Sequence, residues 1–344
     1  MAYTTIPKST DYFNTKLYTG TGSSNAQTGV GFQPDWIWLK NRSSLSNHHL
    51  VDAVRGITKE LRSNLTNTEA TDDQLITAFG SDGFTVGTSG SGNTNGDNYA
   101  SWNWKANGAG SANTDGDINS TVSANTTSGF SIVKYTGNGT AGATVGHGLG
   151  VKPAMIIFKC LSVAGPSWVV YHQSKGATYT LYLNETSGGG TSAEMLNNTE
   201  PTSSLITLGN GTSSNSSSAS TIAYCFAEKQ GYSKFGSYTG NGSADGPFIY
   251  TGMKPAFIMI KRTDAASQWT IYDNKRLGYN VGNNYMFVTN DAEGTGINID
   301  LLSNGFKARQ ATSNEINTSG ASYIYMAFAE APLVGTNNIP ANAR

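Results

Sequence analysis

Charged residues are scarce in this chain of 344 residues, at 13% of the sequence, where about 25% is usual. The 22 lysine and arginine residues nearly balance the 23 aspartate and glutamate residues, and the formal net charge is −1. Binding to nucleic acid needs clustered lysine and arginine, so no nucleic-acid partner is expected. No apolar run approaches the ~18 to 20 residues that span a bilayer. The sequence therefore predicts no membrane insertion, and residues 1–5 do not have the pattern of a signal peptide.

Cysteine is rare as well, and the short motifs of common catalytic sites are missing. Cys160 and Cys225 both fall on expected strands. One pair in a long chain is no disulfide framework. A bond between them stays open, although two buried thiols in a protein made in a reducing cytoplasm are the favoured interpretation. The four histidines have no metal-ligand spacing, and the chain has no Walker sequence and no Gly-x-Ser-x-Gly elbow. No enzyme activity, catalytic residue, metal site or cofactor is predicted.

The abundant feature of the sequence is repetition, because one pattern occurs three times. Each copy opens on Tyr-Thr-Gly, and a later proline is followed by an apolar run that ends in lysine. Each copy then places a polar residue at the end of another apolar stretch, and closes on an aromatic-rich segment. The openings begin at Tyr18, Tyr135 and Tyr238, the runs end at Lys40, Lys159 and Lys261, and the polar residues are Asp52, His172 and Asp273. At the polar position a satisfied strand-end group is favoured over a catalytic role.

Strand periodicity dominates each copy. β-branched and aromatic residues alternate between turns rich in glycine and asparagine, and helical character is limited to short stretches such as residues 57–65. The fold class predicted is all-β, with three tandem β-sandwich domains of jelly-roll or lectin-like type. In such a unit the opening strand pairs with the closing strand. The expected boundaries are repeat 1 at 1–106, a linker at 107–128 with room for one short strand, repeat 2 at 129–230, repeat 3 at 231–332 and a C-terminal tail at 333–344.

Two kinds of binding site remain open in the sequence. Exposed aromatic rings next to amide side chains stack on and hydrogen-bond sugars, and the candidates for a glycan or receptor site are Trp168, Trp269, Tyr279 and Asn280. Core packing is the alternative, and the favoured one, for both tryptophans. Oxygen-rich loops at residues 72–73, 115–117 and 291–293 are the places for a structural calcium ion, although none has EF-hand spacing.

Several segments together resemble a repeat domain of virion structural proteins from tailed phages, especially marine and cyanobacterial ones, over nearly the whole chain. The segments are Gly31 to Arg42, Asp52 to Gly56, Ser81 to Val86, Trp102 to Ala106 and Tyr323 to Pro332. The resemblance implies a tail fibre or appendage component, located in the virion and made in the bacterial host cytoplasm. For such a component the expected partners are other virion proteins and a host surface glycan or outer-membrane component. A homo-oligomer is expected, and a trimer is the natural guess for a fibre. Capsid decoration without host binding is the alternative, and a lectin-domain glycan hydrolase is the third hypothesis.

Overall fold

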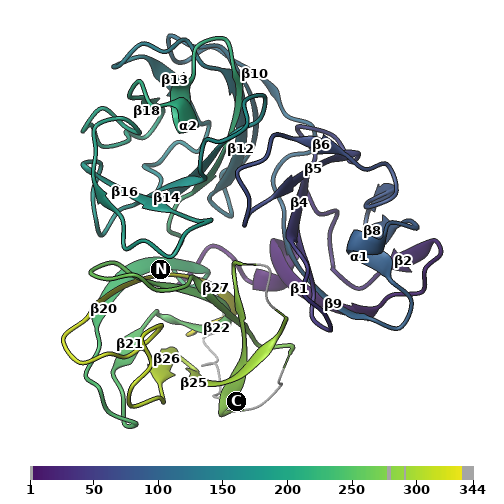
Figure 1. The fold of residues 1–344 in the computed structure, drawn as a ribbon, viewed down its shortest axis with the longest axis vertical. Coiled ribbons are helices and arrows are strands. Elements are labelled where there is room, and N and C mark those ends of the chain that lie inside the picture. Colours follow the sequence, from purple (N-terminus) through teal and green to yellow (C-terminus); the bar gives the residue numbers. More distant parts are fainter. Residues whose placement is uncertain (1–2, 277–279, 290–291, 335–344) are drawn as a thin grey trace.

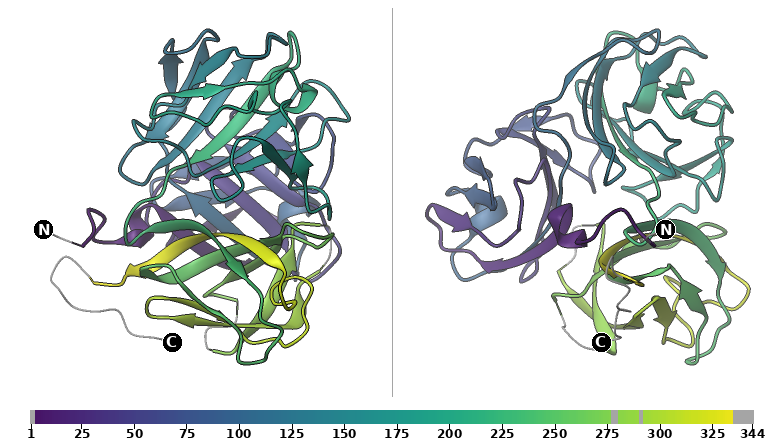
Figure 2. Two further views of the ribbon diagram at one scale, coloured as in Figure 1. Left: turned by 90° about the vertical axis from the view of Figure 1, so that its left-hand side faces the viewer. Right: turned by 180° about the vertical axis from the view of Figure 1, so that it is seen from behind.

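In the computed structural model, which describes residues 3–276, 280–289 and 292–334, the three repeats form three lobes around a common centre (Figures 1 and 2). The described elements are almost all strands. The helical ones are the short η1 (Ser9–Asp11), α1 (Gly90–Asn93) and α2 (Thr212–Asn215). The all-β prediction is confirmed, and several sheets make up the fold. Within the described residues, no helix is long and apolar enough to cross a membrane.

Repeat 1 builds one main sheet in the order β1-β9-β3-β4-β5-β6 and a small sheet in the order β2-β8-β7. The closing strand pairs with the opening strand, as predicted, with Tyr18 opposite Tyr99. Strand β5 lies inside residues 57–65, where the sequence allowed a helical turn. The bounds are β1 Phe13–Thr19, β2 Asn25–Gln27, β3 Trp36–Asn41, β4 His48–Asp52, β5 Lys59–Arg62, β6 Ala70–Thr71, β7 Ala78–Gly80, β8 Gly83–Val86 and β9 Asn98–Trp104.

Repeat 2 has the same central order, β12-β19-β14-β15-β16, inside an eight-stranded sheet. The segment expected as a linker, 107–128, contains two strands, of which β11 pairs with β12 and so extends this sheet. The expectation of a linker with room for one short strand was wrong, because serine and threonine alternate with small apolar residues there and suit a sheet edge. The bounds are β10 Ser111–Asn113, β11 Ser120–Asn125, β12 Phe130–Thr136, β13 Thr144–Gly146, β14 Met155–Cys160, β15 Val169–His172, β16 Tyr179–Tyr182, β17 Gly190–Thr191, β18 Leu205–Thr207 and β19 Ser220–Phe226.

Repeat 3 repeats the order once more, as β20-β27-β22-β23-β24, and its sheet continues through β25 and β26 to β21. The expected tail, 333–344, lies outside the described residues from residue 335 onward. The bounds are β20 Ser233–Thr239, β21 Phe248–Tyr250, β22 Met253–Arg262, β23 Thr270–Asp273, β24 Gly282–Phe287, β25 Gly294–Leu302, β26 Gly305–Ala308 and β27 Ser322–Pro332.

Each main sheet is buried on both faces, and this explains why its central strands are continuously apolar. Successive side chains of a strand point to opposite faces. In β3, Trp36 and Trp38 enter a core cluster that takes side chains from all three repeats, whereas Ile37 and Leu39 enter a cluster belonging to repeat 1 alone. We call the shared cluster the central core. Strands β14 and β22 divide their side chains in the same way between the central core and an outer core of their own repeat.

Candidate functional site

The two candidate tryptophans lie in the central core and connect neighbouring repeats. Trp168 is fully buried, and its Nε1 donates to the backbone oxygens of Arg62 and Leu65 in repeat 1, each at 3.1 Å. Trp269 is 2% exposed, and its Nε1 donates to the oxygen of Tyr182 in repeat 2 at 2.8 Å. Neither indole offers a face to a sugar, so the glycan-stacking reading of these two residues is corrected in favour of core packing.

The other two candidates do not complete a binding site. Tyr279 lies outside the described residues. Asn280 is half-buried, and both ends of its amide bond the backbone of Leu301, with Nδ2 donating to the oxygen and Oδ1 accepting from the nitrogen, each at 2.9 Å. The three described candidates are therefore spread over separate structural contacts rather than gathered on one surface.

The third contact between repeats is made by a histidine at the position equivalent to the two tryptophans. His48 of repeat 1 places its Nε2 2.8 Å from the backbone oxygen of Phe287 in repeat 3, while its Nδ1 accepts from Trp38 Nε1 at 2.7 Å. The indole can only donate, so Nδ1 is the acceptor and Nε2 carries the proton that bonds Phe287. Repeat 1 thus contacts repeat 3 as repeat 2 contacts repeat 1, and the lobes form a closed ring.

The repeated polar position lies at these junctions, and each copy bonds the next repeat. Asp52 Oδ2 accepts from the Tyr224 hydroxyl at 2.8 Å, and Asp273 Oδ2 accepts from Trp102 Nε1 at 3.0 Å. In repeat 2 the residue is His172, whose Nε2 lies 3.1 Å from the backbone oxygen of Tyr325. All three side chains are buried. The interpretation as satisfied strand-end groups therefore agrees with their hydrogen bonds.

The identity of the polar residue follows the chemistry of its partner. Trp102 and Tyr224 occupy the same place in repeats 1 and 2, each is a hydrogen-bond donor, and each faces an aspartate. In repeat 3 that place holds Met326, which has no proton to donate. The residue facing this strand is His172, which donates to the backbone instead, while its Nδ1 accepts from the nitrogen of Ser174. A buried aspartate there would have no donor from Met326.

Each junction aspartate also holds an arginine three residues later. Arg55 Nε lies 2.5 Å from Asp52 Oδ2, and Arg276 Nε lies 2.6 Å from Asp273 Oδ2, and all four side chains are fully buried. Burial alone would raise the pKa of Asp273, but the attraction of Arg276 and hydrogen bonds to the carboxylate hold this pKa below its ordinary value. Asp273 is therefore an anion held in a buried ion pair, and Asp52 makes the same contact with Arg55.

Protonation of His172 gives a testable pH dependence. Burial lowers its pKa from 6.5 to about 4, so the unfolded chain takes up this proton first as the pH falls. The stability that neutral His172 contributes is complete above pH 6.5 and declines as the pH falls toward 4, by roughly 2 to 3 kcal/mol at pH 4.5. Urea unfolding at pH 7.5 and 4.5 checks this against His172→Gln, which keeps a donor for Tyr325 without titrating. The variant should lose less stability over this interval by that amount, and an equal loss in both proteins would contradict the assignment.

Two of the lysines that end the apolar runs donate hydrogen bonds to backbone oxygens of their own hairpin loop and of the neighbouring repeat. Lys159 Nζ donates to the oxygen of Pro166 in its own loop at 2.7 Å and to Thr66 of repeat 1 at 3.1 Å. Lys261 repeats the arrangement with Ser267 at 2.5 Å and Thr186 of repeat 2 at 2.8 Å. Burial lowers the pKa of both lysines to about 8. These amines satisfy carbonyl groups that the folded loops remove from water, and their role is structural.

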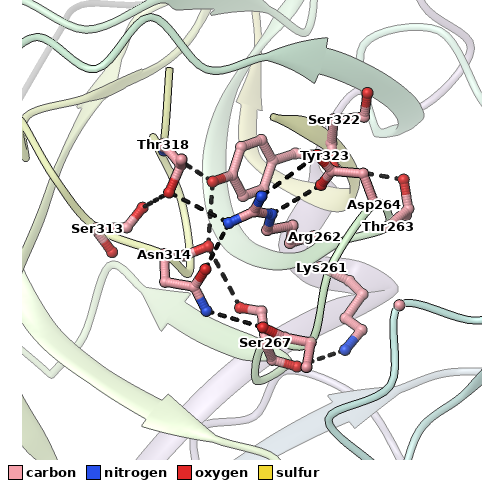
Figure 3. A network of polar contacts seen from close by, with 12 residues as sticks. Lys261, Arg262, Thr263, Asp264, Ser267, Ser313, Asn314, Thr318, Ser322 and Tyr323 are labelled. Carbon is pink, nitrogen blue, oxygen red and sulfur yellow. Dashed lines mark hydrogen bonds and ion pairs between the residues drawn. The ribbon is translucent and has the colours of Figure 1, made fainter. Parts of the chain in front are cut away.

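A network of polar contacts around Arg262 holds the loop between β22 and β23 in repeat 3 (Figure 3). The guanidinium bonds Asp264 through Nε at 2.8 Å and Asn314 through Nη1 at 2.6 Å. Asn314 in turn donates to the oxygen of Ala266 at 2.9 Å, and its own backbone oxygen accepts from the Tyr323 hydroxyl at 3.1 Å. The network holds two loops together, and its polar groups are engaged with one another.

In the loops considered for calcium, carboxylates accept hydrogen bonds from other segments of the same repeat. Asp117 Oδ2 accepts from the nitrogen and the hydroxyl of Thr144, and Asp72 Oδ2 accepts from the Ser89 hydroxyl. Asp291 lies outside the described residues. Across the residues that the structure describes, no group of three or more histidine, cysteine, aspartate or glutamate side chains could hold a metal ion. Both cysteines are free and buried.

A surface groove at the start of repeat 3 combines an exposed aromatic ring with charged side chains. It has a volume of about 360 Å³ and lies between the first described residues, the turn that leads into β20 and the turn that follows β21. Tyr250 is 54% exposed, and Phe248, on the same face of β21, is 47% exposed. The groove is lined by Tyr3, Glu228, Gln230, Gly231, Ser233, Lys234, Tyr250, Thr251 and Gly252.

Two contacts shape this groove. The Tyr3 hydroxyl donates to the oxygen of Gly252 at 2.7 Å, and burial together with the neighbouring Tyr250 raises the pKa of Tyr3 to about 12. In the same lining Lys234 Nζ lies 2.6 Å from Glu228 Oε1. None of these residues belongs to a recognisable binding motif in the sequence. The alternation of Phe248, Ile249 and Tyr250 was a signal for a strand, but it does not tell which face meets solvent.

The fold and its junctions define an all-β protein in which three related repeats close into a ring around one shared core. The chain belongs to a family described as a domain of unknown function (DUF7483), whose model matches residues 8–332. No curated protein and no solved structure matches the chain.

Proposed function

We propose that this protein is a non-enzymatic structural component of a tailed-phage virion, in a tail fibre or appendage that presents a binding surface to a host glycan. In this proposal each repeat is one β-sandwich unit of jelly-roll or lectin-like type, and the chain assembles with other virion proteins and with further copies of itself. The resemblance of residues 31–42 and 323–332 to phage virion proteins supports the setting, and the low charge supports a surface of neutral polar loops.

The observation that carries the binding role is the groove beside Tyr250. A glycan hydrolase of the usual kind needs two carboxyl groups across its cleft, about 5 to 10 Å apart. Glu228 is the one carboxylate among the described residues that line the groove, and it is paired with Lys234. Exposed aromatic rings without a carboxylate pair favour a binder over a hydrolase.

The ring itself favours a second candidate function. Three similar lobes around one centre give the chain an approximate threefold arrangement (Figure 1). A protein of this shape suits a threefold axis on the surface of a symmetric capsid. The alternative is therefore a capsid decoration protein that stabilises the particle without touching the host.

Localisation on purified virions tests both candidates. An antibody raised against this chain, viewed by electron microscopy, should label the tail appendages, and the purified protein should block adsorption of the phage to host cells. Label spread over the capsid, without any effect on adsorption, would overturn the appendage proposal in favour of decoration. Absence of label from the virion would overturn both.

A further inference from the structure

The groove beside Tyr250 combines three properties that suit a ligand site. It is large enough for a small ligand, since ligand sites occupy about 300 to 1,000 Å³ and this one measures about 360 Å³. It exposes an aromatic ring, which gives contact area at low entropic cost. It also contains a cation and an anion whose side chains are partly exposed, at 37% for Lys234 and 33% for Glu228.

The charges in the groove sum to zero, and this selects the ligand. Lys234 is a donor and Glu228 an acceptor, and they lie 2.6 Å apart, so together they offer adjacent sites of opposite polarity. An anionic ligand would approach Glu228 and compete with it for Lys234. A pair of neighbouring hydroxyl groups fits better, because each hydroxyl both donates and accepts, and bonds to charged groups are the stronger ones.

The aromatic wall supplies the complementary contact. A pyranose ring has one face made largely of C–H groups, which packs against the face of an aromatic ring. Tyr250 lies at one end of β21, and Phe248, two residues earlier, points to the same side of the strand. The two rings form an apolar strip along one face of β21.

We infer that this groove binds an uncharged saccharide, with a pyranose ring against Tyr250 and two adjacent hydroxyl groups bonded to Lys234 and Glu228. The inference rests on the proposed glycan-binding role and specifies its site and its ligand class. Gln230 and Thr251 line the same groove and present further polar groups to the ligand. Phe248 would contact a second sugar unit in a longer chain.

Binding of the full chain to a printed array of defined neutral and uronic-acid-containing oligosaccharides tests the inference. We expect binding to neutral members in preference to acidic ones. Tyr250→Ala should weaken binding roughly tenfold or more, as should Lys234→Met, whereas Tyr250→Phe, which keeps the ring, should stay within about threefold of the parent. Leu45→Ala is the matched control, because Leu45 is 72% exposed in repeat 1 and should leave binding unchanged.

The outcomes separate this inference from the virion proposal. Preference for acidic glycans, no binding to any neutral glycan, or full binding by Tyr250→Ala would overturn the site. Thermal unfolding of each variant shows whether a loss reflects the groove or the fold, and Lys234→Met keeps the test decisive if Tyr250→Ala is unstable, since full binding by Lys234→Met would also overturn the site. A capsid location in the labelling experiment would overturn the appendage role, yet leave saccharide binding to be decided by the array alone.

Discussion

Asp273→Ala is expected to lower the free energy of unfolding by about 3 to 5 kcal/mol, because it removes one partner of a buried ion pair. Arg276, fully buried, would keep its charge without a counter-ion. Trp102 Nε1 would lose its acceptor across the junction between repeats 3 and 1. Urea unfolding at neutral pH, followed by tryptophan fluorescence, measures the change.

An exposed pair in the same chain provides the control for this variant. Lys8 and Asp11 also lie three residues apart, with Nζ 2.7 Å from Oδ1, but their side chains are 64% and 44% exposed. Asp11→Ala should cost no more than about 1 kcal/mol, because water solvates both charges. If the two substitutions lower the free energy of unfolding equally, Arg276 must reach solvent, and the junction is not buried as described above.

Trp104→Ala is expected to destabilise all three repeats together. Its ring lies in the central core beside Phe226 of repeat 2 and beside Phe257 and Phe328 of repeat 3, with ring centroids 5.6 to 6.3 Å apart. Truncation of a buried tryptophan costs about 3 to 5 kcal/mol. Hydrogen exchange followed by mass spectrometry should therefore show faster exchange in the main sheets of every repeat.

A residue of an outer core separates this shared effect from a local one. Phe84 is also buried, but it belongs to the cluster formed by repeat 1 alone. Phe84→Ala should raise exchange mainly in the small sheet β2-β8-β7, since local openings follow local contacts. Faster exchange confined to repeat 1 in Trp104→Ala would mean that the lobes are stable independently of one another.

The sequence predicted most of what is local to one repeat. Pairing of the opening and closing strands followed from the ends of the pattern and is seen for Tyr18 and Tyr99. The recurrence of lysine after each apolar run marked a shared position, although its role required the structure, because the carbonyl groups that Lys159 bonds come from two different repeats.

Contacts between repeats could not be predicted in the same way. A strand buried on both faces reads as a continuous apolar run, and nothing in the run tells what covers the second face. Trp168 shows the consequence, because a tryptophan between a polar loop and an apolar strand suits either a sugar platform or a core. Its indole bonds repeat 1, more than a hundred residues earlier in the chain.

The groove beside Tyr250 could not be predicted from the sequence for a related reason. Its walls come from residues 3, 228–234 and 250–252, which the fold brings together from distant parts of the chain. No spacing rule connects such residues. Only the burial of Ile249 between exposed Phe248 and Tyr250 reveals which face of β21 is free.

Each junction between repeats has its own matched donor and acceptor. This matching limits how far the repeats can be exchanged or lost. Asp52 suits Tyr224, Asp273 suits Trp102 and His172 suits the strand that carries Met326. Genetic recombination that exchanged two copies would set an aspartate against methionine, and deletion of one copy would leave two open faces. A linear array of repeats survives the loss of a unit because each unit contacts only its neighbours. In this ring the three repeats are no longer interchangeable, so both their number and their order must be kept together.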